Sequence, residues 1–411
     1  MFNDLLSARE NRRKIITEKT KTTDVVSVKA NVVGAIKNLP TSKLLLSYFT
    51  KRVQDLGVEN LVLYKNTDGD TAIGEIKDGL LLKEKTVFIE ENDVLGRFID
   101  IDVTLKGQTQ SLSRGGLRKC FLCSNPAFVC GKNKTHTLRE LLDFFNDKTQ
   151  EEIHQKLSNI LKESLFGELN LENKFGLVTP TDNGSHTDLN YSVMKKSGEE
   201  IATILPQAFF VGLNATEIDS LFEKLREVGQ RAEKVMLSAT NGANAYKGFI
   251  FIACVLLGST GYVISNHLSY NDIYKTAKEI CKDLCKTKLN TFGYKAHVDG
   301  FGGIRKTAKD GFTVVDYAKN LINQDNLLEV LCKIVGKIDD SVLLKRAKSK
   351  EKYDYYKNLI SNADYNDQNA LKTLTEKCKA DNISIGGSAD VLISALMMKK
   401  LTETFYFWEK K

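Results

Sequence analysis

The chain has 411 residues, of which 42% are apolar and 27% charged, and its formal net charge is +7. These proportions exclude a disordered or fibrous protein and predict two or three globular domains of ordinary size. Charges of both signs alternate without a basic tail or stripe, so the sequence argues against nucleic-acid binding and favours anionic small ligands or an acidic protein partner.

Proline is rare, and its positions divide the chain. Four prolines occur, at 40, 126, 180 and 206, and none follows residue 206. Because proline removes a backbone donor and clashes with the preceding helical turn, a long stretch without it, rich in Leu, Lys, Glu and Ala, predicts helices. An all-β chain and a proline-rich scaffold are excluded.

The first 150 residues predict a mixed α and β domain. Helical spacing over 5–18, and again after Pro40, alternates with strand-like runs at 25–28, 60–64 and 86–89.

A further strand is predicted at 96–103. Its alternation puts Asp100 and Asp102 on one face and the apolar residues on the other. A Gly-, Ser- and Arg-rich loop and a cysteine cluster follow, and Thr137 with Glu140 forms a capping box that begins a helix.

The second half reads as helices separated by glycine-bearing loops. We expect the boundary near 147–160, which gives domains 1–155 and 156–411. The long uncharged run 248–266 predicts a buried helix that ends in a turn at 258–261, in preference to a membrane span. Eight cysteines without an export signal predict reduced thiols and a cytoplasmic protein.

Asp100 and Asp102 form the first candidate site. Two carboxylates about 7 Å apart on one strand face can share divalent cations such as Mg²⁺, which nucleotidyl transfer requires. Arg97, Arg114 and Arg118 lie close in sequence and supply cations for phosphate oxygens. A solvated strand face and an ordinary surface loop are the alternatives.

The cysteine cluster has the spacing of a zinc site. Cys120, Cys123, Cys130 and His136 would suit a closed structural Zn²⁺ centre. The intervening residues are apolar, however, so buried free thiols that pack as small hydrophobes are the competing interpretation, and redox chemistry is a third.

Polar loops of the second half provide further candidates. They are proton-handling or metal-binding acids and a histidine (His186, Asp188, Glu233 and Asp390) and phosphate-binding residues (Asn183, Gly184, Asn244, Lys247, Arg305, Gly386, Gly387 and Ser388). Loops that enter helices offer N–H groups and a helix dipole to phosphates, although each loop alone is more often a connector. Four such loops, at 182–188, 239–248, 300–306 and 386–390, together predict one anionic-ligand site.

Residues 1 to about 150 resemble the apo-citrate lyase phosphoribosyl-dephospho-coenzyme A transferase family. The matching segments are 6–10, 96–103, Ser113-Arg114 and the Cys120 to His136 cluster. This resemblance implies an α+β, nucleotidyltransferase-like domain.

Residues from about 160 onward resemble the triphosphoribosyl-dephospho-coenzyme A synthase family. The matching segments are 176–178, 183–188, 239–248, 303–305 and 382–390. Departures from the family pattern occur at Thr179, at Ala245-Tyr246 in place of Thr-His, and around Asp339-Asp340-Ser341 and 344–347. The implied architecture is therefore multidomain, with the α+β domain followed by an all-α domain.

Together the resemblances imply a bifunctional transferase with two consecutive reactions. The helical half would take ATP and 3′-dephospho-coenzyme A, release adenine and form the triphosphoribosyl product. The first half would transfer that product to a serine of the citrate lyase acyl carrier protein, its gamma subunit, with release of pyrophosphate. Asp100 and Asp102 would hold Mg²⁺, and the three arginines would neutralise the triphosphate.

Other functions stay open at this point. The same chemistry could serve a malonate decarboxylase carrier, the cysteine cluster could fold a zinc knuckle for RNA, or the synthase half could be a degenerate scaffold. Scattered charge without interleaved aromatic residues disfavours the RNA-binding alternative.

Overall fold

The chain forms two compact units. The computed structural model describes residues 2–284, 301–323 and 326–409. One unit comprises Met1–Lys156, Ile264–Tyr270 and Thr402–Lys411, and the other comprises Leu157–Val263 and Asn271–Leu401. The first division lies inside the continuous helix α5 (Leu138–Leu169).

The first unit contains a four-stranded antiparallel sheet in the order β2-β3-β1-β4. The strands are β1 (Asp24–Ala30), β2 (Glu59–Tyr64), β3 (Thr71–Ile76) and β4 (Ile99–Thr104). The strands predicted at 25–28, 60–64 and within 96–103 are confirmed. β3 was not predicted because Gly74 interrupts its pattern; a Cβ there would lie 2.4 Å from Val58 Cγ1 of the adjoining segment.

The prediction of a strand at 86–89 is wrong. These residues lie in helix α3 (Gly79–Asn92), whose N-terminus is capped by Asp78 Oδ1 accepting from the Leu81 N–H (3.0 Å). Their β-branched and aromatic composition favours a strand, but Leu82, Thr86 and Ile89 are buried at helical spacing. Burial of this stripe against the sheet outweighs the weaker local propensity.

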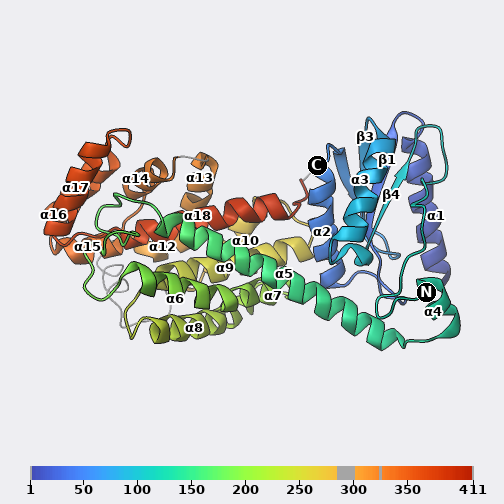
Figure 1. Cartoon of the computed structure of the whole chain (residues 1–411), viewed down its shortest axis with the longest axis horizontal. Coiled ribbons are helices and arrows are strands. Elements are labelled where there is room, and N and C mark those ends of the chain that lie inside the picture. The colour runs from blue at the N-terminus through green and yellow to red at the C-terminus, as the bar shows by residue number, and fades with distance from the viewer. Residues whose placement is uncertain (1, 285–300, 324–325, 410–411) are drawn as a thin grey trace. The chain divides into compact units, whose positions relative to one another are not determined.

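Helices cover the sheet on two sides. Figure 1 shows it between α1 (Phe2–Lys19) and the pair formed by α2 (Pro40–Gln54) and α3. A short 3-10 turn (Gly96–Phe98) leads into β4, and α4 (Ala127–Asn133) precedes α5. The predicted capping box at the start of α5 is present: Thr137 N–H donates to Glu140 Oε2 (2.7 Å), and Glu140 N–H donates to Thr137 Oγ1 (3.2 Å).

Two segments from the second half of the sequence complete the first unit. Tyr406 exchanges hydrogen bonds with Ser47 of α2, through its N–H (3.1 Å) and its carbonyl (2.8 Å). His267 Nε2 lies 2.8 Å from Asp70 Oδ2, and both residues are buried. Residues more than 190 positions away therefore belong to the core of the α+β unit.

The second unit is helical, and no strand is assigned to it within the described ranges. Besides the end of α5, its helices are α6 (Tyr191–Ile204), α7 (Pro206–Leu213), α8 (Leu221–Ala239), α9 (Lys247–Ser265), α10 (Asp272–Ile280), α12 (Gly303–Lys309), α13 (Thr313–Leu321), α14 (Leu327–Lys337), α15 (Ser341–Ala347), α16 (Lys350–Ser361), α17 (Gln368–Ala380) and α18 (Gly386–Thr404). Helix α6 packs against α8, and α14 packs against α16. An α+β region followed by a mostly helical part agrees with the architecture expected from the sequence.

The uncharged run forms helix α9 without the expected turn at 258–261. A Cβ at Gly261 would lie 2.0 Å from Phe209 O, and a Cβ at Gly212 would lie 1.8 Å from Gly258 O. The glycines thus let α7 and α9 approach closely; they do not end the helix. α9 is long and apolar enough to cross a membrane, but 83% of its most apolar window is buried inside the protein, as in a core helix.

Candidate functional site

Asp100 and Asp102 lie on one face of β4, as their alternation predicts. In the ladder with β1, Asp100 pairs with Lys29 and Asp102 with Ser27. Their neighbours Ile99, Ile101 and Val103 are buried. Burial, together with repulsion from Asp102, raises the pKa of Asp100, although the Arg118 charge opposes this. The two carboxylates are therefore close enough to repel one another.

Arg118 reaches the open edge of β4. Its guanidinium donates to the Ile99 carbonyl (2.9 Å) and to Glu90 Oε1 (2.8 Å), and it forms an ion pair with Asp100. Glu90 in turn accepts the Ile101 N–H (2.9 Å), and Lys83 Nζ donates to the Ile101 carbonyl (3.1 Å). Side chains thus cover the sheet edge, which would otherwise present unpaired backbone groups.

The other two predicted arginines differ in position. Arg114 lies 3.7 Å from the buried Glu90 carboxylate, so it joins Arg118 near the acidic pair. Arg97 is exposed and donates to the carbonyls of Cys120 (3.0 Å) and Phe121 (3.4 Å), which links the turn before β4 to the cysteine segment.

A second group of cations on this side of the sheet was missed by the sequence analysis. Asp68 is fully buried and accepts from Arg9 (2.9 Å), Arg12 (2.8 Å) and Lys29 (2.9 Å). Burial opposes its charge, but the three hydrogen bonds outweigh that effect and lower the pKa of Asp68 to about 2. Arg9 lies in the 6–10 segment that matches the transferase family, and this match was the available signal.

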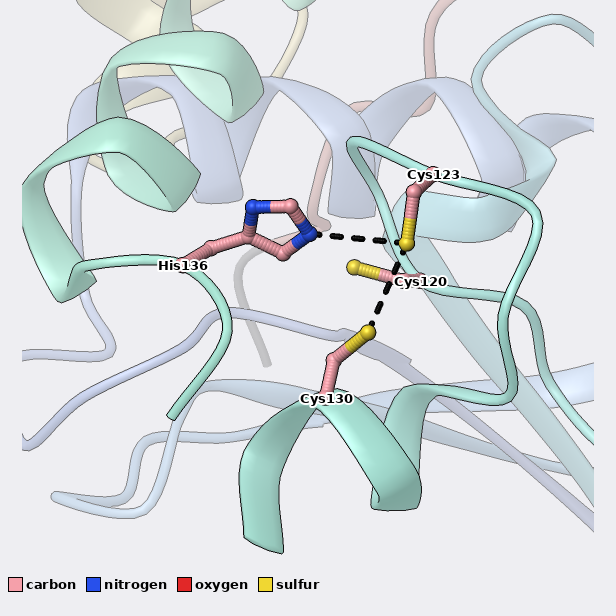
Figure 2. Close-up of side chains that lie close together, drawn as sticks. All are labelled: Cys120, Cys123, Cys130 and His136. Carbon is pink, nitrogen blue, oxygen red and sulfur yellow. Dashed lines mark hydrogen bonds between the residues drawn. The ribbon is translucent and has the colours of Figure 1, made fainter. Parts of the chain in front are cut away.

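The predicted metal ligands Cys120, Cys123, Cys130 and His136 come together (Figure 2). Their ligand atoms all lie within 4.8 Å of one another. Cys123 Sγ is 3.4 Å from Cys130 Sγ and 3.4 Å from His136 Nε2. The segment rests on buried aromatic rings: Phe121 packs edge-on against Phe98 at 4.9 Å between centroids.

In the helical unit, the loop 182–188 packs on the segment before α18. A Cβ at Gly176 would lie 2.0 Å from Ile383 O, and Ser185 Oγ donates to the same carbonyl (2.5 Å). Gly184 has φ +61°, and a Cβ there would lie 2.3 Å from Gly176 O. The Asn183 carbonyl accepts the His186 N–H (3.2 Å). This predicted glycine turn is therefore required sterically, and its backbone groups serve local packing.

His186 is held between two elements. Its Nε2 lies 3.3 Å from Ser384 Oγ, and its Nδ1 lies 3.4 Å from the Arg346 guanidinium and 3.9 Å from the exposed Asp188 carboxylate. Burial, with the nearby Arg346 charge, lowers the pKa of His186 to about 4. The imidazole is consequently neutral at physiological pH. Arg346, which also binds the Ser185 carbonyl (3.0 Å), was not among the predicted site residues.

The N-terminus of α18 already binds a carboxylate. The buried Asp340 accepts from the Gly387 N–H (3.3 Å), the Ser388 N–H (2.8 Å) and the Ser388 hydroxyl (2.8 Å). It also caps α15 through the N–H groups of Val342 (2.9 Å) and Leu343 (3.1 Å). Gly386 opens the same helix turn. The N–H groups expected to bind phosphate are thus engaged by an internal anion.

The N-terminus of α9 is arranged similarly. Asn244 Oδ1 accepts the Lys247 N–H (3.1 Å), and the Asp390 carboxyl group lies against the first turn of the helix. A Cβ at Gly248 would lie 2.1 Å from Asp390 Oδ2, so only glycine allows this approach. Burial, together with the charge of Asp340, raises the pKa of Asp390 well above its ordinary value.

The remaining predicted residues lie beside or outside the cluster formed by the loop 182–188 and the starts of α9 and α18. Lys247 Nζ forms a half-exposed ion pair with Glu233 (2.8 Å). Arg305 is buried and donates to the Leu284 carbonyl (2.9 Å), and Gly300 of the same predicted loop lies outside the described residues. The loops 182–188, 239–248 and 386–390 converge on the start of α18. The described part of the loop 300–306 lies beside Asp339, which Lys306 Nζ approaches to 3.7 Å, and the next residue, Asp340, binds that helix start.

Two features of this cluster were not predicted. Lys174 and Glu168 form a fully buried ion pair (2.8 Å). Tyr246, which departs from the synthase pattern, is buried, and its hydroxyl has no hydrogen-bond partner among the described residues. Burial, with the charges of Glu168 and Asp390, raises its pKa well above the ordinary value.

Two protein-family profiles divide the chain between them. Residues 1–152 match the family described as apo-citrate lyase phosphoribosyl-dephospho-CoA transferase, and residues 154–408 match ATP:dephospho-CoA triphosphoribosyl transferase.

Some relatives match most of the chain, and others match only a portion of it. Protein CitXG of Leuconostoc mesenteroides subsp. cremoris is 30% identical over 96% of this chain and 95% of its own length. Protein CitXG of Haemophilus influenzae is 25% identical over 76% of this chain and 71% of its own. The "probable 2-(5''-triphosphoribosyl)-3'-dephosphocoenzyme-A synthase" of Photobacterium profundum is 34% identical over 42% of this chain and 59% of its own.

Proposed function

The chain belongs to the family of bifunctional transferases that fuse an apo-citrate lyase phosphoribosyl-dephospho-CoA transferase to an ATP:dephospho-CoA triphosphoribosyl transferase, and we propose the following division of its chemistry. The helical unit displaces adenine from ATP and joins the triphosphoribosyl group to the ribose of 3′-dephospho-CoA. The α+β unit transfers the product to a serine of the citrate lyase acyl carrier protein, the gamma subunit, and releases pyrophosphate.

The observation that carries the nucleotidyl-transfer assignment is the acidic pair on β4. Asp100 and Asp102 share a strand face with Lys29, and Arg118 and Arg114 approach from the loop that follows. A polyphosphate that loses pyrophosphate needs both carboxylates for cations and fixed positive charges for its own oxygens. Both kinds of group are present on one side of one sheet.

The carboxylates fit Mg²⁺. Their donor set is oxygen only, and their mutual repulsion, which contributes to the raised pKa of Asp100, would be relieved by a divalent cation. When bound, Mg²⁺ would neutralise charge on the triphosphate and favour departure of pyrophosphate.

The cations of the α+β unit then divide into two groups. Arg118 orients Asp100, because it binds that carboxylate, Glu90 and the strand edge together. Arg9 and Arg12 pair with Asp68, which also binds Lys29, the residue opposite Asp100 in the sheet. The Arg9 side chain is about half exposed. We assign triphosphate contacts to Arg9, Arg12, Arg97 and Arg114, and a positioning role to Arg118.

In the helical unit we assign proton handling to His186 and Asp188. The neutral imidazole can accept a hydrogen bond from a ribose hydroxyl, and the exposed Asp188 beside it can bind a cation or orient the ring. Lys247, which is half exposed at the start of α9 and pairs with Glu233, is the cationic phosphate candidate beside this region. Asp340 and Asp390 shape this region by holding the helix N-termini.

One incubation tests both reactions. The full chain is mixed with ATP, Mg²⁺, 3′-dephospho-CoA and the apo acyl carrier protein of citrate lyase, and the carrier is read by intact mass. We expect a mass increase equal to phosphoribosyl-dephospho-CoA, together with release of adenine. An unmodified carrier in the presence of released adenine would contradict the transfer assignment alone. Labelling of an apo malonate decarboxylase carrier in preference would replace the carrier assignment.

A single substitution tests the helical site. Asp188→Asn should stop adenine release from ATP, whereas the variant should still label the carrier when supplied with preformed triphosphoribosyl-dephospho-CoA. Unchanged adenine release would remove Asp188 from the site. Asp219→Asn, at an exposed acid paired with Lys282, is the matched control.

A further inference from the structure

We propose that Cys120, Cys123, Cys130 and His136 bind one structural Zn²⁺ ion in the α+β unit. The four side chains come from three places in the chain and point toward one common centre in Figure 2. Cys120 and Cys123 lie in the loop after β4, Cys130 lies on α4, and His136 lies just before α5.

The distances suit a tetrahedral site. With Zn–S near 2.3 Å and Zn–N near 2.0 Å, tetrahedral ligand atoms lie about 3.5–3.8 Å apart. The Cys123–Cys130 and Cys123–His136 separations are both 3.4 Å, and no pair within the cluster exceeds 4.8 Å. A closed set of four protein ligands leaves no position for substrate, which indicates a structural ion.

Backbone hydrogen bonds close the turns that carry the four side chains. Cys120 N–H donates to the Asn125 carbonyl (2.8 Å), which closes the turn that contains Cys123. Thr135 N–H donates to the Cys130 carbonyl (3.0 Å), which closes the end of α4 just before His136. These turns bring the ligand atoms together at the distances given above.

The ion would hold the loop that carries the arginines. Arg118 and Ala127 are joined by a backbone hydrogen bond (2.7 Å), so the cysteine turn directly follows Arg118, whose side chain binds Asp100. Arg97 adds its hydrogen bond to the Cys120 carbonyl. Between Leu112 and α4 this segment has no helix or strand beyond an isolated bridge between Lys119 and Pro126, so cross-linking by a metal would add order to the few backbone hydrogen bonds that close it.

Metal content of the intact protein tests the proposal. The full chain, produced in zinc-supplemented medium and freed of loosely bound metal, should contain about one zinc per chain by mass spectrometry of the metal. A thiol-specific mercurial should release that zinc in proportion to the thiols modified. Cobalt-substituted protein should show the thiolate charge-transfer and intense ligand-field bands of a tetrahedral sulfur site.

Substitutions assign the ligands. Cys123→Ser and His136→Ala should each reduce bound zinc by about tenfold or more, whereas Cys378→Ala, at a buried thiol of the helical unit, should retain it. Wild-type protein without zinc and without tetrahedral cobalt bands would overturn the proposal even if the variants fail to fold. An intact mass two hydrogens lower, with no metal, would identify a disulfide in its place.

Discussion

The two units use carboxylates in opposite ways. On β4 of the α+β unit, Asp100 and Asp102 project from one strand face, and Asp100 forms an ion pair with the Arg118 side chain. In the helical unit, Asp340 and Asp390 are drawn inward, and their partners are backbone N–H groups at the starts of α18 and α9. A strand face satisfies its backbone within the sheet and leaves side-chain oxygens for ligands. A helix N-terminus has orphan N–H groups, and these take up the carboxylate.

This contrast separates two roles that look alike in the sequence. Asp100, Asp102 and Asp390 were all candidates for metal or proton chemistry, whereas Asp340 was not among the predicted site residues. In the structure, Asp340 and Asp390 lie at helix starts, whereas Asp100 and Asp102 share a strand face on which Asp100 pairs with Arg118. The following predictions test that distinction, from the largest expected effect to the smallest.

The largest effect is expected at the strand. Asp102→Asn should reduce carrier labelling by on the order of 10³-fold, because it removes a charged oxygen donor needed to hold Mg²⁺ against the triphosphate. Adenine release should be unchanged. The measurement is the rate of each reaction on the same preparation, with Asp143→Asn, at an exposed acid on α5, as the control. Loss of both activities would count against the division of labour between the units.

At the helix, the expected loss is in stability. Asp340→Ala should lower the free energy of unfolding of the helical unit by about 3 kcal/mol, because the amide groups of Val342, Leu343, Gly387 and Ser388 would lose their acceptor. Asp340→Asn keeps one oxygen and should cost less. Urea denaturation followed by circular dichroism measures both. Equal stability of the alanine variant and wild type would show that the carboxylate is not a structural anion.

The buried pair of Asp70 and His267 should give a smaller change, confined to the α+β unit. His267→Ala removes a hydrogen-bonded partner of a buried carboxylate and should lower stability by about 2 kcal/mol. Trp408, the single tryptophan of the chain, lies 6.0 Å from the His267 ring, so its fluorescence reports unfolding of this unit. His154→Ala is the control, and an unshifted transition for His267→Ala would contradict this assignment.

The smallest effect at neutral pH concerns His186, because it develops only on acidification. Its pKa of about 4 lies below the ordinary value of about 6.5, so between these pH values the unfolded chain binds a proton that the folded chain does not. The helical unit should therefore lose stability as pH falls from about 6.5 to 4.

Arg346→Gln separates the two causes of that low pKa. Removing the nearby positive charge should raise the pKa of His186 by less than about one unit, because burial is the larger cause and is retained. NMR titration of the histidine rings measures it. A value in the variant that equals that of an exposed histidine would mean that burial contributes little.

Local patterns predicted much of the fold and part of the site. Alternation placed Asp100 and Asp102 on one strand face, and the cysteine spacing identified four side chains that cluster in the structure. The strand expected at 86–89 failed because an i, i+4 buried stripe outweighed β propensity. The turn expected at 258–261 failed because its glycines serve close helix packing. Composition alone does not distinguish a glycine that ends a helix from one that allows a neighbouring helix to pack closely.

The sequence by itself determined the order of the two units, the acidic strand and the cysteine cluster, because each depends on residues a few positions apart, whose spacing the backbone period sets. Only the tertiary structure decided that Arg9 and Arg12 meet Asp68, that Asp340 binds Ser388, and that 264–270 and 402–411 complete the α+β unit. Those pairings join residues about 50 to several hundred positions apart, and the packing of whole elements, which no local period encodes, selects them.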